Sequence, residues 1–140
     1  MAYRARVLEF LSPSWWEAFA SALAETVVDP GAGDGSALLV IDGEPSEARF
    51  GVAVRDGALT AINGVEAESV EPAVIVRCDR ATALRLASGL ESAQAALAEG
   101  RMQLAGDVRG LTVVAAAAPA IAGATAALRA RTRFPSPGNG

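Results

Sequence analysis

Alternation of apolar residues with charged or small ones across residues 49–55 is the feature that most restricts the fold. Phe50, Val52 and Val54 occupy every second position of that segment. A period of two is typical of a β-strand with one buried face. Asp56-Gly57 follows directly, and both residues tolerate the positive φ that a two-residue hairpin turn requires. The segment therefore predicts a half-buried strand that ends in a hairpin turn.

The apolar period changes from two to helical spacing after residue 78, which predicts an α+β domain. Five strands are expected, at residues 37–42, 47–56, 58–64, 73–78 and 101–106, with a further turn at Asn63-Gly64. Helix caps and stops predict a helix that begins near residues 12–14, one capped by Asp79, one capped by Ser92, and a long alanine-rich segment opened by Gly106-Asp107. One domain is expected over residues 1–134, with a disordered tail over residues 135–140.

Residues 14–27 carry the signals of an amphipathic helix. Ser14 and Glu17 have the spacing of a capping box, in which the serine accepts from the third helical amide and the glutamate reaches back. Pro13 is tolerated beside them because early helical amides have no partner within the helix. Trp16 is expected in the core, whereas the position of Trp15 stays open. The helical spacing predicts one buried face, made of Trp16, Phe19, Ala20, Leu23 and Val27.

An uncharged stretch from Leu111 to Leu128 is close to the minimum length for crossing a bilayer. Most of its residues are alanine, which favours insertion only weakly. Pro119 is expected to kink or break a helix at its centre, because proline lacks the amide hydrogen that the helix interior uses. The stretch therefore predicts a buried pair of helices and no transmembrane segment.

The residue types that this chain lacks exclude several classes of site. Its 12 basic residues are all arginine, it has no histidine, and Cys78 is its single cysteine. It therefore has no Schiff-base amine, no phosphate-loop lysine and no imidazole base or metal ligand. One cysteine also excludes intrachain disulfides and multi-cysteine zinc sites. A net charge of −4 disfavours nucleic acid as a partner. We expect no cofactor, no metal and no catalytic residue, and the lack of a signal-peptide pattern predicts a cytoplasmic protein.

Residues 89–107 hold a set of glycines and polar residues at fixed spacing. A glycine is followed five residues on by glutamine, two later by alanine, and eleven after the first glycine by a second one. A strand then ends in glycine plus aspartate. The set is Gly89, Gln94, Ala96, Gly100, Gly106 and Asp107. In this register the chain resembles the sterol carrier protein 2 family, and the resemblance extends over roughly residues 12–118.

The resemblance implies a five-stranded, mostly antiparallel sheet covered by helices on one face, with an apolar tunnel between sheet and helices. It implies non-enzymatic carriage of an apolar small molecule: a fatty acid, an acyl-CoA or a sterol-like lipid. The chain departs from the family at Leu90, where lysine is usual, and at Leu97-Ala98, where an aromatic pair is common. These changes reshape the tunnel wall. The motif register and the apolar faces together predict these ligand-lining residues: Phe19, Leu86, Leu90, Gln94, Leu97, Met102, Leu104, Val114 and Ile121.

Two other functions stay open at this point. Small side chains over residues 93–98 and 115–118 leave volume that either a ligand or another protein element must fill. An accessory protein with the same fold, a filled cavity and contacts to a partner or a second copy in a homodimer would also use them. An enzyme would depend on carboxylates alone, such as Glu68 or Asp107, and their spacing gives no support for one.

Overall fold

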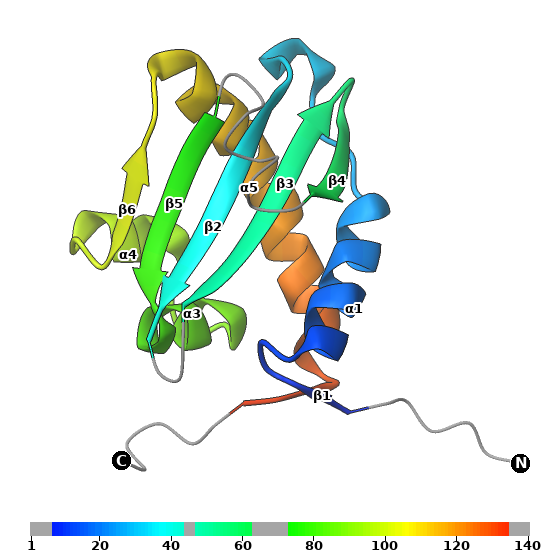
Figure 1. Cartoon of the computed structure of the whole chain (residues 1–140), viewed down its shortest axis with the longest axis vertical. Helices are drawn as coiled ribbons and strands as arrows, with labels where there is room; N and C mark the ends of the chain where they lie inside the picture. Colours follow the sequence, from blue (N-terminus) through cyan, green and yellow to red (C-terminus); the bar gives the residue numbers. More distant parts are fainter. Residues whose placement is uncertain (1–6, 44–46, 63–72, 135–140) are drawn as a thin grey trace, which may run out of the picture.

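The computed structural model describes residues 7–43, 47–62 and 73–134 and contains a twisted sheet of five strands (Figure 1). The strands are β2 (Gly35–Asp42), β3 (Ala48–Arg55), β4 (Ala58–Ile62), β5 (Ala73–Asp79) and β6 (Met102–Ala105), in the order β4-β3-β2-β5-β6. β2 and β5 run parallel, and the other three neighbouring pairs are antiparallel. The predicted mostly antiparallel sheet is therefore confirmed. The predicted turn at Asn63-Gly64 and the predicted tail lie outside the described residues.

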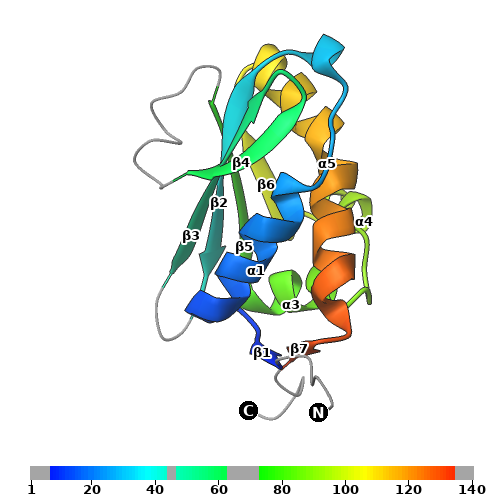
Figure 2. The same cartoon turned by 90° about the vertical axis from the view of Figure 1, so that its right-hand side faces the viewer.

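The helices lie together on one face of this sheet, as Figure 2 shows. They are α1 (Pro13–Ala24), α3 (Arg80–Ala87), α4 (Ala93–Ala98) and α5 (Val108–Arg129), with a short 3₁₀ turn at Pro30–Ala32. Two short strands, β1 (Leu8–Glu9) and β7 (Thr132–Arg133), form a separate parallel pair. This pair joins the two ends of the described chain below α1 and α5, and the sequence analysis did not predict it.

The hairpin between β3 and β4 forms where the sequence predicts it. Asp56 and Gly57 have φ values of 49° and 80°, the left-handed conformations that a two-residue hairpin turn needs. The Asp34 carboxylate accepts the Asp56 amide at 2.9 Å, and the Gly57 carbonyl accepts the Val28 amide at 2.8 Å. The turn is therefore held by the loop that follows α1 as well as by its own backbone preference.

The helix α1 begins within the predicted range, residues 12–14, but the predicted cap is wrong. Ser12, not Ser14, is the N-cap, and its hydroxyl accepts the Trp15 amide at 3.2 Å, while Pro13 takes the first helical position. The helix ends at Ala24. Val27 therefore lies beyond the helix and is 83% exposed, although the helical pattern places it in the core.

The buried face of α1 also differs from the predicted one. Trp16, which is expected in the core, is half-buried, whereas Trp15, whose position the sequence leaves open, is the buried one. The Trp15 indole stacks on Phe19 and donates its N–H to the hydroxyl of Thr132 at 3.2 Å. Trp16 instead stacks on Phe50 of β3 with the ring centroids 4.5 Å apart. Partners from distant strands thus decide which tryptophan is enclosed.

Of the kink or break predicted at Pro119, the break is wrong, because α5 is one continuous helix of 22 residues. Proline removes the hydrogen bond that residue 119 would donate to the carbonyl of Ala115. Both residues lie on the exposed side of the helix, where water can take the free carbonyl. The buried helix pair that the sequence predicts is therefore a single helix that is buried along one stripe.

Within the described part of the chain, α5 is long and apolar enough to cross a bilayer by length and composition alone. The core helix of a protein that folds in water passes the same test. One stripe of α5 is buried in the described structure, made of Gly110, Val113, Ala117, Ala124 and Leu128. Most of these residues pack with α1 and with the helix-covered face of β3 and β4, while 22% of the apolar window of α5 is buried in the described structure.

The face of the sheet beneath the helices is called the inner face here. Because side chains alternate along a strand and aligned neighbours share a face, the strand register identifies its members. In β3 they are Phe50, Val52 and Val54, and in β2 they are their partners Leu39, Ala37 and Gly35. The register of β5 and β6 extends the same rows to Val74, Val76, Cys78, Met102 and Leu104. On the opposite face, Leu38 and Val40 form a second small cluster.

Candidate functional site

The signature around α4 builds the ends of that short helix. Ser92 is its N-cap, and the serine hydroxyl accepts the Ala95 amide at 3.2 Å. Gly89 and Gly100 flank the segment with φ values of 83° and 76°, a conformation that glycine adopts without the strain a Cβ would cause. Ala96 of α4 is completely buried, with 0% exposure. Its methyl is surrounded by packed atoms, so the free space that the sequence analysis expects beside α4 does not adjoin this residue.

The end of the signature fixes the start of α5. Asp107 is the N-cap, and its carboxylate accepts the Gly110 amide at 2.9 Å. A Cβ on Gly106 or on Gly110 would lie 2.8 or 2.7 Å from one methyl of Val74, which is far closer than atoms pack. The two glycines therefore form a notch that receives the Val74 side chain of β5. The glutamine of the signature, Gln94, lies on α4 and its side chain is exposed.

The inner face of β5 and β6 is apolar but only partly covered. Val74 is fully buried, whereas Val76, Cys78 and Met102 are half-buried. Leu104, the partner of Val76 on the edge strand, is 38% exposed. Exposure thus increases from the centre of the sheet toward β6, although α3, α4 and α5 lie on this side of the sheet (Figure 2).

The other end of the inner face is closely filled. Val52, Val54 and Leu59 beneath α1 are at most 4% exposed. Phe19 packs against Trp15, Trp16 and Phe50 with ring centroids 5.2 to 5.9 Å apart. The core of this protein is therefore better filled beneath α1 than beneath α3 and α4, although the inner-face pair Phe50 and Leu39 is also half-buried. Leu104, at 38%, is the most exposed apolar side chain of the described inner face, so an apolar molecule has most to cover at the β5–β6 end.

The structure places the nine predicted ligand-lining residues in three environments. Phe19 lies in the filled core beneath α1, and Ile121 of α5 packs against the same cluster. Leu90 is 65% exposed beyond α3, and Gln94 is exposed on α4. The remaining residues are half-buried or moderately exposed on elements that surround the inner face of β5 and β6: Leu86, Leu97, Met102, Leu104 and Val114. Met102 and Leu104 lie on that inner face by register, and that all five line one ligand site stays a prediction.

Cys78 lies on this inner face opposite Met102 and Ile41. Burial, together with the negative charges of Asp79 and Asp42, raises the pKa of its thiol to about 11. The thiol is therefore protonated at neutral pH, and a protonated thiol is a poor nucleophile. Cys78 acts here as a small apolar side chain of the sheet.

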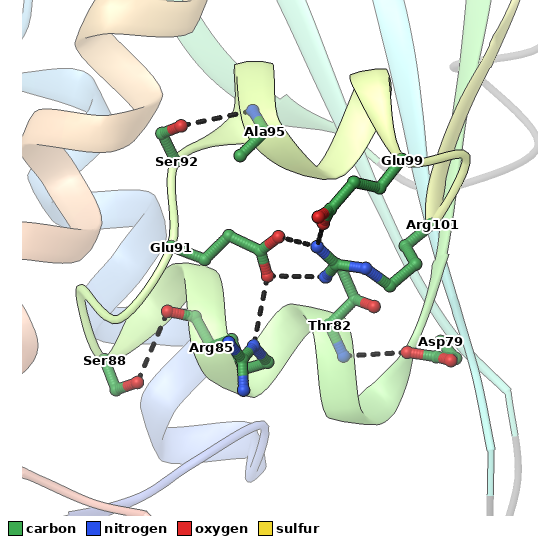
Figure 3. A network of polar contacts seen from close by, with 9 residues as sticks. All are labelled: Asp79, Thr82, Arg85, Ser88, Glu91, Ser92, Ala95, Glu99 and Arg101. Carbon is green, nitrogen blue, oxygen red and sulfur yellow. Dashed lines mark hydrogen bonds and ion pairs between the residues drawn. The ribbon is translucent and has the colours of Figure 1, made fainter.

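A network of charged side chains joins α3, α4 and β6 (Figure 3). The Glu91 carboxylate is only 5% exposed and accepts from two arginines, at 3.1 Å from the Arg85 guanidinium and in a two-pronged contact from Arg101. Arg101 also donates to Glu99, whose side chain is 62% exposed. These arginines hold the pKa of Glu91 below its ordinary value. The sequence analysis did not find this network, although Glu91 and Arg101 flank α4 with opposite charges.

Among the residues that the structure describes, no three cysteine, aspartate or glutamate side chains lie together as metal ligands do. Asp107, one of the two carboxylates considered for catalysis, is engaged as the cap of α5. Glu68, the other, lies outside the described residues.

Solved structures of sterol carrier proteins have the same arrangement of strands and helices. A structure of sterol carrier protein 2 matches with a TM-score of 0.60 and 19% identity, over 83% of this chain and 97% of that one. The conserved hypothetical protein TT1886 of Thermus thermophilus matches with a TM-score of 0.59 and 20% identity, over 99% and 100%. The palmitated sterol carrier protein 2-like 2 of Aedes aegypti matches with a TM-score of 0.55 and 19% identity, over 77% and 91%.

No family model matches the sequence, and neither does any curated protein. The agreement is thus one of three-dimensional structure at low identity. It extends over most of each solved chain and includes the five-stranded sheet with helices on one face. The chain therefore has the sterol carrier protein 2-like fold.

Proposed function

We propose that this protein binds and carries one apolar, lipid-like molecule, a fatty-acyl or sterol-like ligand, against the inner face of β5 and β6. The observation that carries the proposal is the incomplete core at this end of the sheet. Val76, Met102 and Leu104 lie beneath helices and still keep solvent-exposed apolar surface. Contact between apolar surface and water is unfavourable, and covering that surface with a ligand stabilises the complex by about 25 cal/mol per Å² of apolar surface buried.

The fold supports the same proposal from a second direction. Structures of sterol carrier protein 2 share it, and one of the matching structures is of a palmitated protein. A ligand between the sheet and α3, α4 and α5 would contact Met102 and Leu104 on β6 and, in our proposal, Leu86, Leu97 and Val114 on the helices. Leu90 and Gln94 would then lie near the rim, and Phe19 would support the wall from the filled core.

We also propose that binding is the whole activity. The thiol of Cys78 has a pKa raised to about 11, and Asp107 is held by the backbone at the start of α5. Neither group is poised to act as a nucleophile or a general base at neutral pH. A carrier needs none, because an apolar surface and a route to it are sufficient.

The experiment that tests the proposal is native mass spectrometry of the purified protein, with organic extraction of any bound lipid and titration with palmitate. We expect a single bound molecule per chain. Leu104→Gln should weaken palmitate binding about threefold to tenfold, because it removes apolar contact from the inner face. Gln103→Ala is the matched control, since residue 103 points to the opposite face of the same strand. Wild-type protein that binds no apolar ligand would reject the proposal.

The outward side of α5 favours one competing function, an accessory protein that acts through contacts with a partner or a second copy. Ala118, Ala122 and Ala126 are exposed at successive turns of this helix, and no charge interrupts them. Small uncharged residues at this spacing allow a second helix to approach closely. A protein that binds no lipid and sediments as a dimer would favour this function over lipid carriage.

A further inference from the structure

α4 is weakly anchored by apolar packing. It has six residues, of which Ala96 alone is fully buried. Leu97 is 38% exposed. Two backbone hydrogen bonds close its C-terminal turn just before β6: the Gly100 amide donates to the Leu97 carbonyl at 3.1 Å, and the Arg101 amide donates to the Ala96 carbonyl at 2.9 Å. Packing alone therefore gives this helix little to hold it over the inner face.

The segment also has a pivot at each end. Gly89 follows α3 and Gly100 precedes β6, and both have left-handed φ values. A Cβ on Gly100 would meet no atom within 4 Å, so the chain has open space around this pivot. Gly89 is the more closely packed end, since a Cβ there would lie 3.0 Å from the guanidinium carbon of Arg129. Residues 90–99 can move as a unit about the two glycines when the backbone hydrogen bonds across them break, while the contacts within the unit stay intact.

The charged network opposes that movement. Glu91 lies inside the unit, whereas its partners Arg85 and Arg101 lie outside it, on α3 and at the start of β6 (Figure 3). Moving the unit separates Glu91 from both arginines. The Glu91 side chain is only 5% exposed. Its carboxylate would therefore lose its hydrogen bonds to both arginines at the start of the movement, and water could replace them only after the unit has opened. We call this set, Glu91 with Arg85 and Arg101, the clasp.

We propose that residues 90–99 form a hinged lid over the inner face of β6, and that the clasp sets how fast an apolar ligand enters and leaves. The ligand part rests on the function proposed above, but the lid itself does not. Glu99 also contacts Arg101, yet it is 62% exposed and water screens it. The buried carboxylate is therefore the one that holds the lid.

Glu91→Gln tests this by removing the charge while keeping the shape of the side chain. The amides of Leu90 and Arg101 donate across the two hinges, to the carbonyls of Arg85 and Ala96, so opening of the lid breaks these two bonds. Hydrogen exchange at both amides should become at least about tenfold faster, because one charge-assisted contact is worth that much or more in an opening equilibrium. Amides of β2 and β3 should exchange at the wild-type rate. Uptake and release of a fluorescent fatty acid should both accelerate about tenfold, with a smaller change in affinity.

Glu99→Gln is the matched control, with the same substitution on the same arginine at an exposed position, and it should change neither rate by more than about twofold. Arg101→Lys, which keeps the charge but loses the two-pronged contact, should have an intermediate effect and serves if Glu91→Gln folds poorly. Unchanged exchange at the Leu90 and Arg101 amides, equal effects of both glutamine variants, or equal acceleration in β3 would overturn the lid. If wild-type protein takes up no fatty acid, the proposed function fails, and the exchange comparison alone decides the lid.

Discussion

Replacing Gly110 by alanine adds a methyl group where α5 touches the sheet. That methyl would lie 2.7 Å from a methyl of Val74, and real Cβ atoms essentially never approach other atoms so closely. Val74 is fully buried, and the same methyl already lies against Gly106. The valine therefore has no room to rotate away, and α5 must shift. Overpacking of this kind costs about 1–3 kcal/mol.

Gly123→Ala on the same helix is the matched control. A Cβ there meets no atom within 4 Å, so the substitution changes only the backbone preference. Alanine in a helix interior is favoured over glycine by about 0.5–1 kcal/mol, so this variant should be more stable than wild type. For a domain of this size, 1 kcal/mol corresponds to about 3–4 °C in Tm.

The assay is thermal unfolding of the three proteins followed by circular dichroism. Gly123→Ala should melt about 2–4 °C above wild type, and Gly110→Ala about 3–10 °C below it. The opposite signs are the informative result, because both substitutions are the same chemical change on one helix. If Gly110→Ala were as stable as Gly123→Ala, α5 would not approach β5 as closely as described, and the wall of the proposed site would be misplaced.

Four further results follow from the structure. Ala96→Leu should lower the free energy of unfolding by about 1–3 kcal/mol through overpacking, whereas Ala98→Leu, exposed on the same helix, should change it little in the same denaturant titration. Asp107→Ala should cost about 1 kcal/mol, measured in the same way, because it removes the N-cap of α5. Alkylation of Cys78 at pH 8 should be about a hundredfold slower than that of a free thiol, since its pKa is raised to about 11; a rate equal to that of a free thiol would show that the side chain is open to water. The pKa of Glu91 is lowered by its arginine partners, so the clasp is fully formed above the ordinary carboxyl pKa and is lost as the pH falls through the lowered one. Exchange at the Leu90 and Arg101 amides, corrected for the intrinsic effect of pH, should therefore accelerate in acid.

Much of the sheet could be predicted from the sequence because its signals are local. The alternation around Val52 and the turn at Asp56-Gly57 specify a strand and its hairpin without reference to the rest of the chain. The caps at Asp79, Ser92 and Asp107 were likewise predictable, since each accepts an amide three residues further on. Such features depend on neighbours in sequence, and the pattern of residue types records them.

The errors arose where distant parts of the chain meet. The enclosure of Trp15 depends on a hydrogen bond to Thr132, 117 residues away, and helical periodicity carries no information about it. Pro119 does not break α5 because the freed carbonyl faces solvent, which the sequence does not state. The lining of the proposed site divides for the same reason. Phe19 and Met102 are both apolar residues of amphipathic elements, but only the second lies where the core is incomplete.

The central claim is that an apolar ligand completes the core at the β5–β6 end of the sheet. It is tested most directly by following the methyl resonances of the protein during titration with palmitate. We expect saturable shifts at a ratio of one ligand per chain for Val76, Met102 and Leu104, with the methyls of Val52 and Val54 beneath α1 nearly unchanged. No saturable shift at any of these methyls, or larger shifts beneath α1 than at β6, would contradict the account.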